Sequence, residues 1–133
     1  MIFTPATINF TLRNGTAIYK NSHWHVEISI ANKEGEVTTP INLSGYTGVC
    51  QIRKTLAPNN TFSVSPIITI IDADTGTFVI DLDDSETAKI PTTGVSFEQV
   101  DRYLYEVQLI DENQNSYRIL HGYVEVSPSA IRN

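Results

Sequence analysis

Residues 22–30, which read SHWHVEISI, decide the fold of this chain. The even-numbered positions are apolar: Trp24, Val26, Ile28 and Ile30. The odd-numbered positions are polar and include His23, His25 and Glu27. Successive side chains of a β-strand point to opposite faces. This alternation therefore predicts a strand with one face on a core and the other face in water.

The His-x-His-x-Glu spacing is also what a metal-binding strand requires, because its three side chains share one face. A zinc site needs three or four ligands, each about 2.0–2.2 Å from the ion. Alternate residues of a strand are about 6.5–7 Å apart, so Glu27 is expected to lie too far away. Another strand must complete the set, and His121 is the candidate. We favour a solvated or interface face and keep His23, His25 and His121 as the metal alternative.

The composition predicts one domain over residues 1–133, with a core at about residues 7–127. A chain of 133 residues fits a single core. The hydrophobic fraction is 41%, and Thr, Ile, Val and Tyr are common, which favours strands. Cys50 is the only cysteine, so neither an intrachain disulfide nor a cysteine-based zinc site is expected. The net charge of −6 argues against nucleic-acid binding.

Turn signals divide the chain into seven expected strands and one helical turn. The strands are residues 7–12, 22–31, 46–54, 67–71, 77–82, 102–111 and 116–126. Asp83 is expected to cap the helical turn, with Glu86 completing a capping box and Pro91 ending the segment. Tyr103 or Tyr105 occupies the place where immunoglobulin-like folds often tie a tyrosine hydroxyl to the backbone. The predicted fold is an all-β, antiparallel, immunoglobulin-like β-sandwich.

The amino end, MIFTPATINF, lacks the basic segment and apolar run of a signal peptide, so no signal peptide is expected. No stretch approaches the ~20 apolar residues that span a bilayer, so no membrane partner is expected.

The last expected strand offers a candidate partner-binding surface. Strict alternation from Leu120 to Val126 places the opposite set outward, namely Tyr117, Ile119, His121 and Tyr123. An exposed aromatic and apolar stripe is typical of partner surfaces. The alternative is that the inward and outward assignments are reversed, or that a loop covers this face.

No catalytic arrangement is evident. Cys50 falls on an inward position, where a thiol behaves as a small apolar group. Residues 72–76, DADTG, resemble the start of a calcium loop, but Thr75 occupies an acidic position, and an ordinary turn is favoured. The sequence predicts a non-enzymatic protein without a cofactor.

Three segments carry a resemblance to a known family. They read GTAIYKNSHWHVEISIANKEGEVTTPINLSGYTGVCQIRKT, DADTGTFVIDLDDSETAKIP and RYLYEVQLIDENQNSYRILHGYVEVSP. The chain, from about Asn14 to Pro128, resembles small β-sandwich structural proteins of tailed bacteriophages, in particular the amino-terminal domain of siphophage baseplate upper proteins. The TTGVSFEQVD insertion and the His-Trp-His motif depart from that pattern.

The resemblance implies a virion component, made in the host cytoplasm, that binds copies of itself or other virion proteins as a homo-oligomer or multicopy assembly. A baseplate, tail-fibre, neck or head-fibre adaptor, or a decoration module, is expected. The alternative is a carbohydrate-binding or adhesin-type module that uses the exposed tyrosines with His121. A His-x-His metal-dependent enzyme is the least favoured reading.

Overall fold

The computed structural model describes residues 4–131. Within this range the chain forms eleven strands and one helical turn. The strands are β1 (Ala6–Thr7), β2 (Ile18–Tyr19), β3 (Trp24–Ser29), β4 (Ala31–Glu34), β5 (Val37–Pro40), β6 (Thr47–Arg53), β7 (Ser63–Val64), β8 (Ile67–Asp72), β9 (Thr77–Leu82), β10 (Asp101–Ile110) and β11 (Ser116–Ser127). The helical turn α1 (Asp84–Thr87) follows β9.

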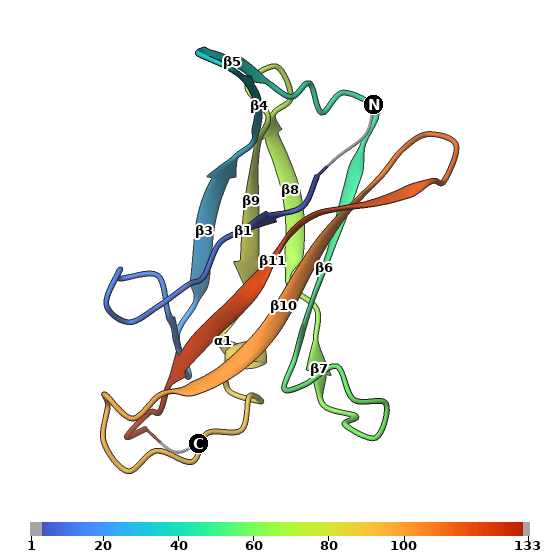
Figure 1. Cartoon of the computed structure of the whole chain (residues 1–133). Coiled ribbons are helices and arrows are strands. Elements are labelled where there is room, and N and C mark those ends of the chain that lie inside the picture. Colours follow the sequence, from blue (N-terminus) through green and yellow to red (C-terminus); the bar gives the residue numbers. More distant parts are fainter. Residues whose placement is uncertain (1–3, 132–133) are drawn as a thin grey trace.

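Two sheets form the body of the molecule. The large sheet has the order β1-β11-β10-β6-β7, with β2 also paired to β11, and the small sheet has the order β3-β9-β8. Figure 1 shows the small sheet lying behind the long strands β10 and β11. The long pairings are antiparallel, whereas the short strands β1 and β2 run parallel to β11. The fold is an immunoglobulin-like β-sandwich.

The core lies between the two sheets and includes the apolar face of β3. Trp24 is buried against Phe10, with ring centroids 5.4 Å apart in an edge-to-face arrangement, and its indole N–H donates to the Thr16 carbonyl. Val26 is half-buried and Ile28 is buried, while His25 and Glu27 are exposed. The alternation predicted for residues 22–30 is confirmed. Each large apolar side chain buried in this way contributes about 1.5–3 kcal/mol.

The tyrosine tie at the entrance to β10 is also confirmed. The Tyr103 hydroxyl donates a hydrogen bond to the carbonyl of Pro91, twelve residues upstream. The predicted capping box before it is wrong. Asp83 is the N-cap residue, but its side chain makes no capping hydrogen bond, and Glu86 instead forms an ion pair with Lys89. The turn is held by Thr87, whose hydroxyl donates to the Ser22 carbonyl at 2.9 Å.

A β-bulge in β11 changes the predicted faces of that strand. Val107 pairs with Leu120, and Gln108 pairs with Arg118, so Ile119 has no partner on β10. The extra residue reverses the side-chain alternation on one side of the bulge. As a result Ile119 is 4% exposed, next to the equally buried Leu120.

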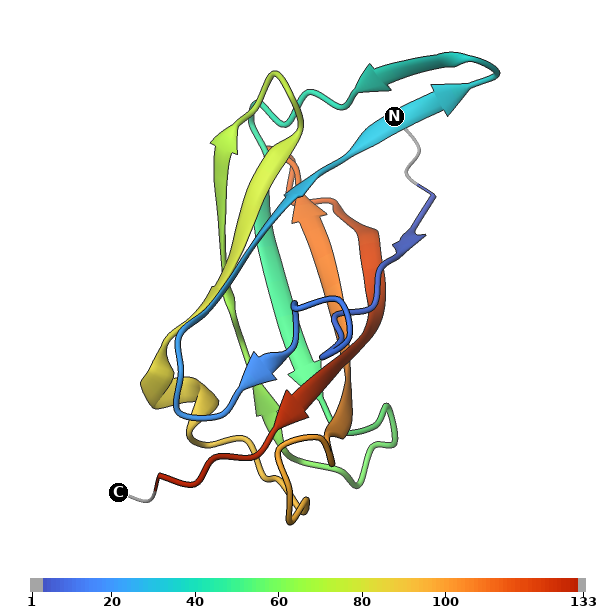
Figure 2. The ribbon, with the colours of Figure 1, turned by 90° about the vertical axis from the view of Figure 1, so that its left-hand side faces the viewer.

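The structure also differs from the prediction in having a projecting hairpin, here called the arm (residues 31–40). It contains β4 and β5, whereas none of the seven expected strands covers residues 32–45. All its strand residues are exposed. Figures 1 and 2 show it extending beyond the sandwich at the end opposite α1. At its base, Ile30 N–H donates to Gly76 and Ile41 N–H donates to the Ile30 carbonyl.

No helix within residues 4–131 is long and apolar enough to cross a membrane.

Candidate functional site

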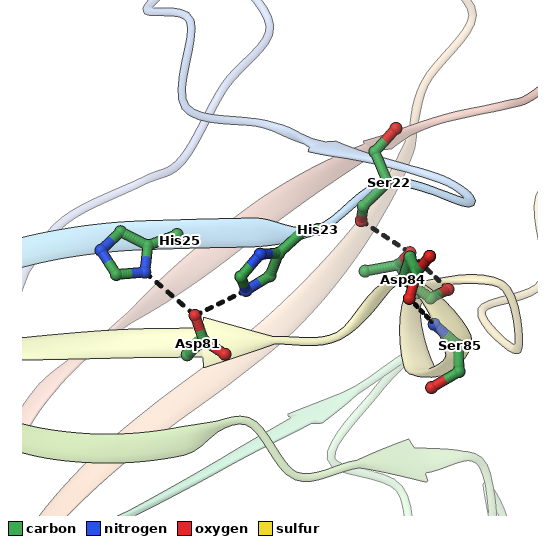
Figure 3. A network of polar contacts seen from close by, with 7 residues as sticks. Ser22, His23, His25, Asp81, Asp84 and Ser85 are labelled. Atoms are coloured by element: carbon green, nitrogen blue, oxygen red, sulfur yellow. Dashed lines mark hydrogen bonds and ion pairs between the residues drawn. The ribbon is translucent and has the colours of Figure 1, made fainter.

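The two imidazoles of the His-Trp-His motif meet one carboxylate. His23 Nε2 lies 2.7 Å from Asp81 Oδ1, and His25 Nδ1 lies 2.9 Å from the same oxygen. Figure 3 shows both rings directed at this oxygen from the edge strand beside β9. The three donor atoms all lie within 4.8 Å of one another. We call these three residues the histidine cluster.

The pairing of β3 with β9 builds this cluster. His25 stands directly opposite Asp81 in the antiparallel register, and His23 lies two residues earlier on the same face. A diagonal neighbour of this kind is within reach of a long side chain. Hydrogen bonds from the imidazoles, that of His25 foremost, lower the pKa of Asp81. The carboxylate is therefore held in its charged form.

The structure separates His121 from the other two histidines. His121 belongs to β11 in the large sheet, and its Nε2 lies 3.3 Å from the Thr7 hydroxyl. The metal alternative in which His121 joins His23 and His25 is therefore not formed, because His121 lies in the other sheet. Asp81 occupies that place. The alternation in TFVIDL places Asp81 outward, but its contact with the histidines depends on the pairing of β3 with β9, which no local pattern encodes.

A second candidate site is a groove of about 1100 Å³ on the outer face of the large sheet. We call it the outer groove. Its floor comes from outward residues of β6, β10 and β11, and the loops around β7 form one wall. The residues used below are Val49, Arg53, Leu56, Ile67, Glu106, Arg118, His121 and Tyr123.

Apolar and charged groups are separated within the outer groove. Leu56, Ile67 and Val49 are 78%, 65% and 47% exposed, so the wall and the adjacent floor offer apolar surface. Across the floor, Arg118 forms an ion pair with Glu106 at 3.2 Å. A cluster of exposed apolar side chains next to charged groups is typical of a surface that binds another molecule.

The predicted partner-binding stripe is only half formed. His121 and Tyr123 line the outer groove, but Ile119 is buried in the core. Tyr117 stands opposite the buried Leu109, on the inner side of the sheet, and its hydroxyl donates to Asp111. The prediction that the four residues share an outward face is wrong, because the bulge at Ile119 divides them.

The tyrosine platform expected for sugar binding is also not assembled. The Arg102 guanidinium lies 3.8 Å from the centroid of the Tyr123 ring and covers one face. Tyr117 is on the other side of the sheet. Stacking on a sugar requires an open ring face, so this surface offers little to a carbohydrate.

Two further sequence features can now be placed. Cys50 is buried, and desolvation raises the pKa of its thiol to about 12, which makes it a poor nucleophile. Residues 72–76 form a turn in which the Thr75 N–H donates to the Asp72 carboxylate and Gly76 has a positive φ of 68°. The ordinary-turn interpretation of DADTG is confirmed.

Comparisons with known proteins add little to this geometry. No protein-family model and no curated protein matches the chain. Among solved structures, that of murine CRIg is similar over 97% of each chain, with 11% sequence identity and a TM-score of 0.32.

Proposed function

We propose that this chain is a non-enzymatic structural protein of a tailed-bacteriophage virion that acts by protein–protein assembly. It serves as an adaptor or decoration module of the baseplate, tail fibre, neck or head fibre. The resemblance of the sequence to phage structural proteins supports the assignment to a virion. The arm is the structural observation that carries the proposal.

The arm is surface that its own domain does not use. The eight strand residues of β4 and β5 are all exposed, and Val37 near its tip is 64% exposed. A two-stranded hairpin alone is only marginally stable in water. A hydrogen bond of 2.9 Å from Ile30 to the Gly76 carbonyl fixes its base to the sandwich, and one of 3.1 Å from Ile41 to the Ile30 carbonyl closes the hairpin. A rooted hairpin of this kind gains stability when a second protein covers it.

The outer groove provides a matching surface on a second copy. Near its tip the arm carries Glu34 and Glu36 beside a single lysine, Lys33. Arg53 and Arg118 line the groove, where Arg118 also pairs with Glu106. Opposite charges steer association and fix the register of an interface. The exposed apolar wall, with Leu56 and Ile67, can cover Val37. We therefore assign the arm of one copy to the outer groove of the next.

Light scattering coupled to size-exclusion chromatography tests assembly. The wild-type protein is expected to form multimers, either alone or when mixed with the proteins encoded beside it. A protein that stays strictly monomeric and binds none of those neighbours contradicts the proposed function.

A charge exchange tests the arm and groove separately. Glu34→Arg with Glu36→Arg should weaken self-association, as should Arg53→Glu with Arg118→Glu. Combining the arm-reversed and groove-reversed proteins should restore it. Glu98→Arg, on an exposed loop, is the matched control and should leave association unchanged. If assembly persists but ignores both reversals, the function stands and this assignment of the contact fails.

A further inference from the structure

We propose that the histidine cluster, His23, His25 and Asp81, binds one divalent transition-metal ion, with Zn²⁺ as its representative. This site goes beyond the proposed function, which needs no metal. It also differs from the predicted set, because the third ligand is Asp81 of β9 rather than His121.

The geometry is close to that of a metal site. In a tetrahedral zinc centre with bonds of about 2.0–2.1 Å, neighbouring ligand atoms are about 3.3 Å apart. The nitrogen–oxygen separations here are 2.7 and 2.9 Å. Each must widen by roughly half an ångström to admit the ion, and the two nitrogen atoms, which lie within 4.8 Å of each other, must come to about the same 3.3 Å spacing. The two histidine side chains are 57% and 58% exposed, so small rotations into solvent supply this widening.

The backbone already holds the ligands on one surface. His25 and Asp81 are directly paired in the ladder between β3 and β9, and the side chain of His23 reaches Asp81 diagonally (Figure 3). Strands packed on a core are more rigid than loops, so little ordering is needed when the ion binds. This preorganisation distinguishes the cluster from scattered surface histidines.

The donor chemistry selects the kind of ion. Two imidazole nitrogens and one carboxylate oxygen suit Zn²⁺ and neighbouring first-row ions such as Ni²⁺ and Cu²⁺. Calcium and magnesium require oxygen ligands almost exclusively and do not fit this set. A neutral imidazole can carry its proton on either ring nitrogen. Both rings can therefore turn a lone pair toward the ion while the other nitrogen carries the proton.

The charge and exposure of the cluster are also consistent with cation binding. Asp81 contributes a carboxylate oxygen, and the whole chain carries a net charge of −6. The partial exposure of all three side chains leaves the remaining coordination position open to water. The inference is a bound ion with three protein ligands.

Isothermal titration of untagged, metal-stripped protein with zinc chloride provides the test. We expect one zinc ion per chain. Each of His23→Ala, His25→Ala and Asp81→Ala should weaken zinc binding at least about tenfold, since loss of even an outer-shell partner commonly costs 10–100-fold. His121→Ala is the matched control, because it removes the third histidine from the other sheet. Its zinc affinity should equal that of the wild type.

Nuclear magnetic resonance of the histidine rings gives a second readout. Zinc should shift the ring signals of His23 and His25 and leave those of His121 in place. Melting curves of the metal-free variants show whether each remains folded. Zinc binding that survives in His23→Ala/His25→Ala, falls equally in His121→Ala, or is undetectable in the folded wild type would overturn the proposal.

Discussion

Ile119 and Leu120 are consecutive residues of β11, yet both side chains are buried in the core. Consecutive residues of a regular strand point to opposite faces, so this relationship requires the bulge that leaves Ile119 unpaired. The bulge carries Tyr117 and Ile119 to the inner side of the sheet and leaves His121 and Tyr123 on the outer groove. It thus decides which half of the aromatic stripe can meet a partner.

The first prediction concerns this bulge. Ile119→Ala should lower the free energy of unfolding by about 2–5 kcal/mol, because it leaves a cavity in the core. Arg118→Ala, one residue earlier, removes a surface ion pair and no core packing, so it should cost the monomer less than about 1 kcal/mol. Urea denaturation measures both changes. Equal and small losses would show that Ile119 is not a core residue.

The second prediction concerns the root of the arm. Gly76 has a φ of 68°, and a Cβ atom there would lie 2.5 Å from the Ile30 carbonyl oxygen and 2.7 Å from that of Ile41. Gly76→Ala should therefore cost clearly more than the ~1–2 kcal/mol expected for a left-handed residue alone. Gly15→Ala is the control, because Gly15 has a φ of 71° and open space around it. Similar melting temperatures for the two variants would contradict the close packing at the root.

The third prediction concerns Asp111 in the turn between β10 and β11. Hydrogen bonds from the backbone N–H groups of Asn115 and Asn113 and from the Tyr117 hydroxyl lower the pKa of its carboxyl group. Because the folded pKa lies below the unfolded one, the stabilisation is present above the unfolded pKa and is lost as pH falls through the folded pKa.

Asp111→Asn should therefore lower the melting temperature at neutral pH and have little effect in strong acid. Melting curves across this pH range, recorded for both proteins, make the comparison. A constant difference between the two proteins at every pH would rule out the charged carboxylate as its source.

The fourth prediction concerns Cys50. Burial raises the pKa of its thiol to about 12, so the folded protein should hardly react with a thiol reagent near neutral pH. Labelling should become complete in denaturant, where the side chain is exposed and its pKa is ordinary. Mass spectrometry after a short pulse of iodoacetamide measures the labelled fraction. Fast labelling of the folded chain would contradict the buried position.

The sandwich could be predicted because its strongest signals are local. The alternation around Trp24 has a period of two, and turn residues punctuate the segments between strands. The hairpin of β8 with β9 and that of β10 with β11 join neighbours in the sequence, so their pairing follows from short connections. The tie from Tyr103 to Pro91 is likewise a contact over only twelve residues.

The remaining features depend on pairings that a single segment does not encode. Asp81 is fifty-six residues from His25, and their contact exists only because β3 pairs with β9. The bulge at Ile119 is set by the register of β11 against β10. Because Ile119 and Leu120 are both apolar, the sequence alone fits either the odd or the even positions facing inward. The arm was missed because residues 31–40 are mainly polar and lack alternation, as expected of a hairpin with no buried face.

The buried position of Cys50 has a consequence for any particle built from this chain. It is the only cysteine in the sequence, and the folded protein shields it from solvent. Folded copies therefore have no accessible thiol with which to form an intermolecular disulfide. A reducing agent should leave an assembly of native subunits unchanged.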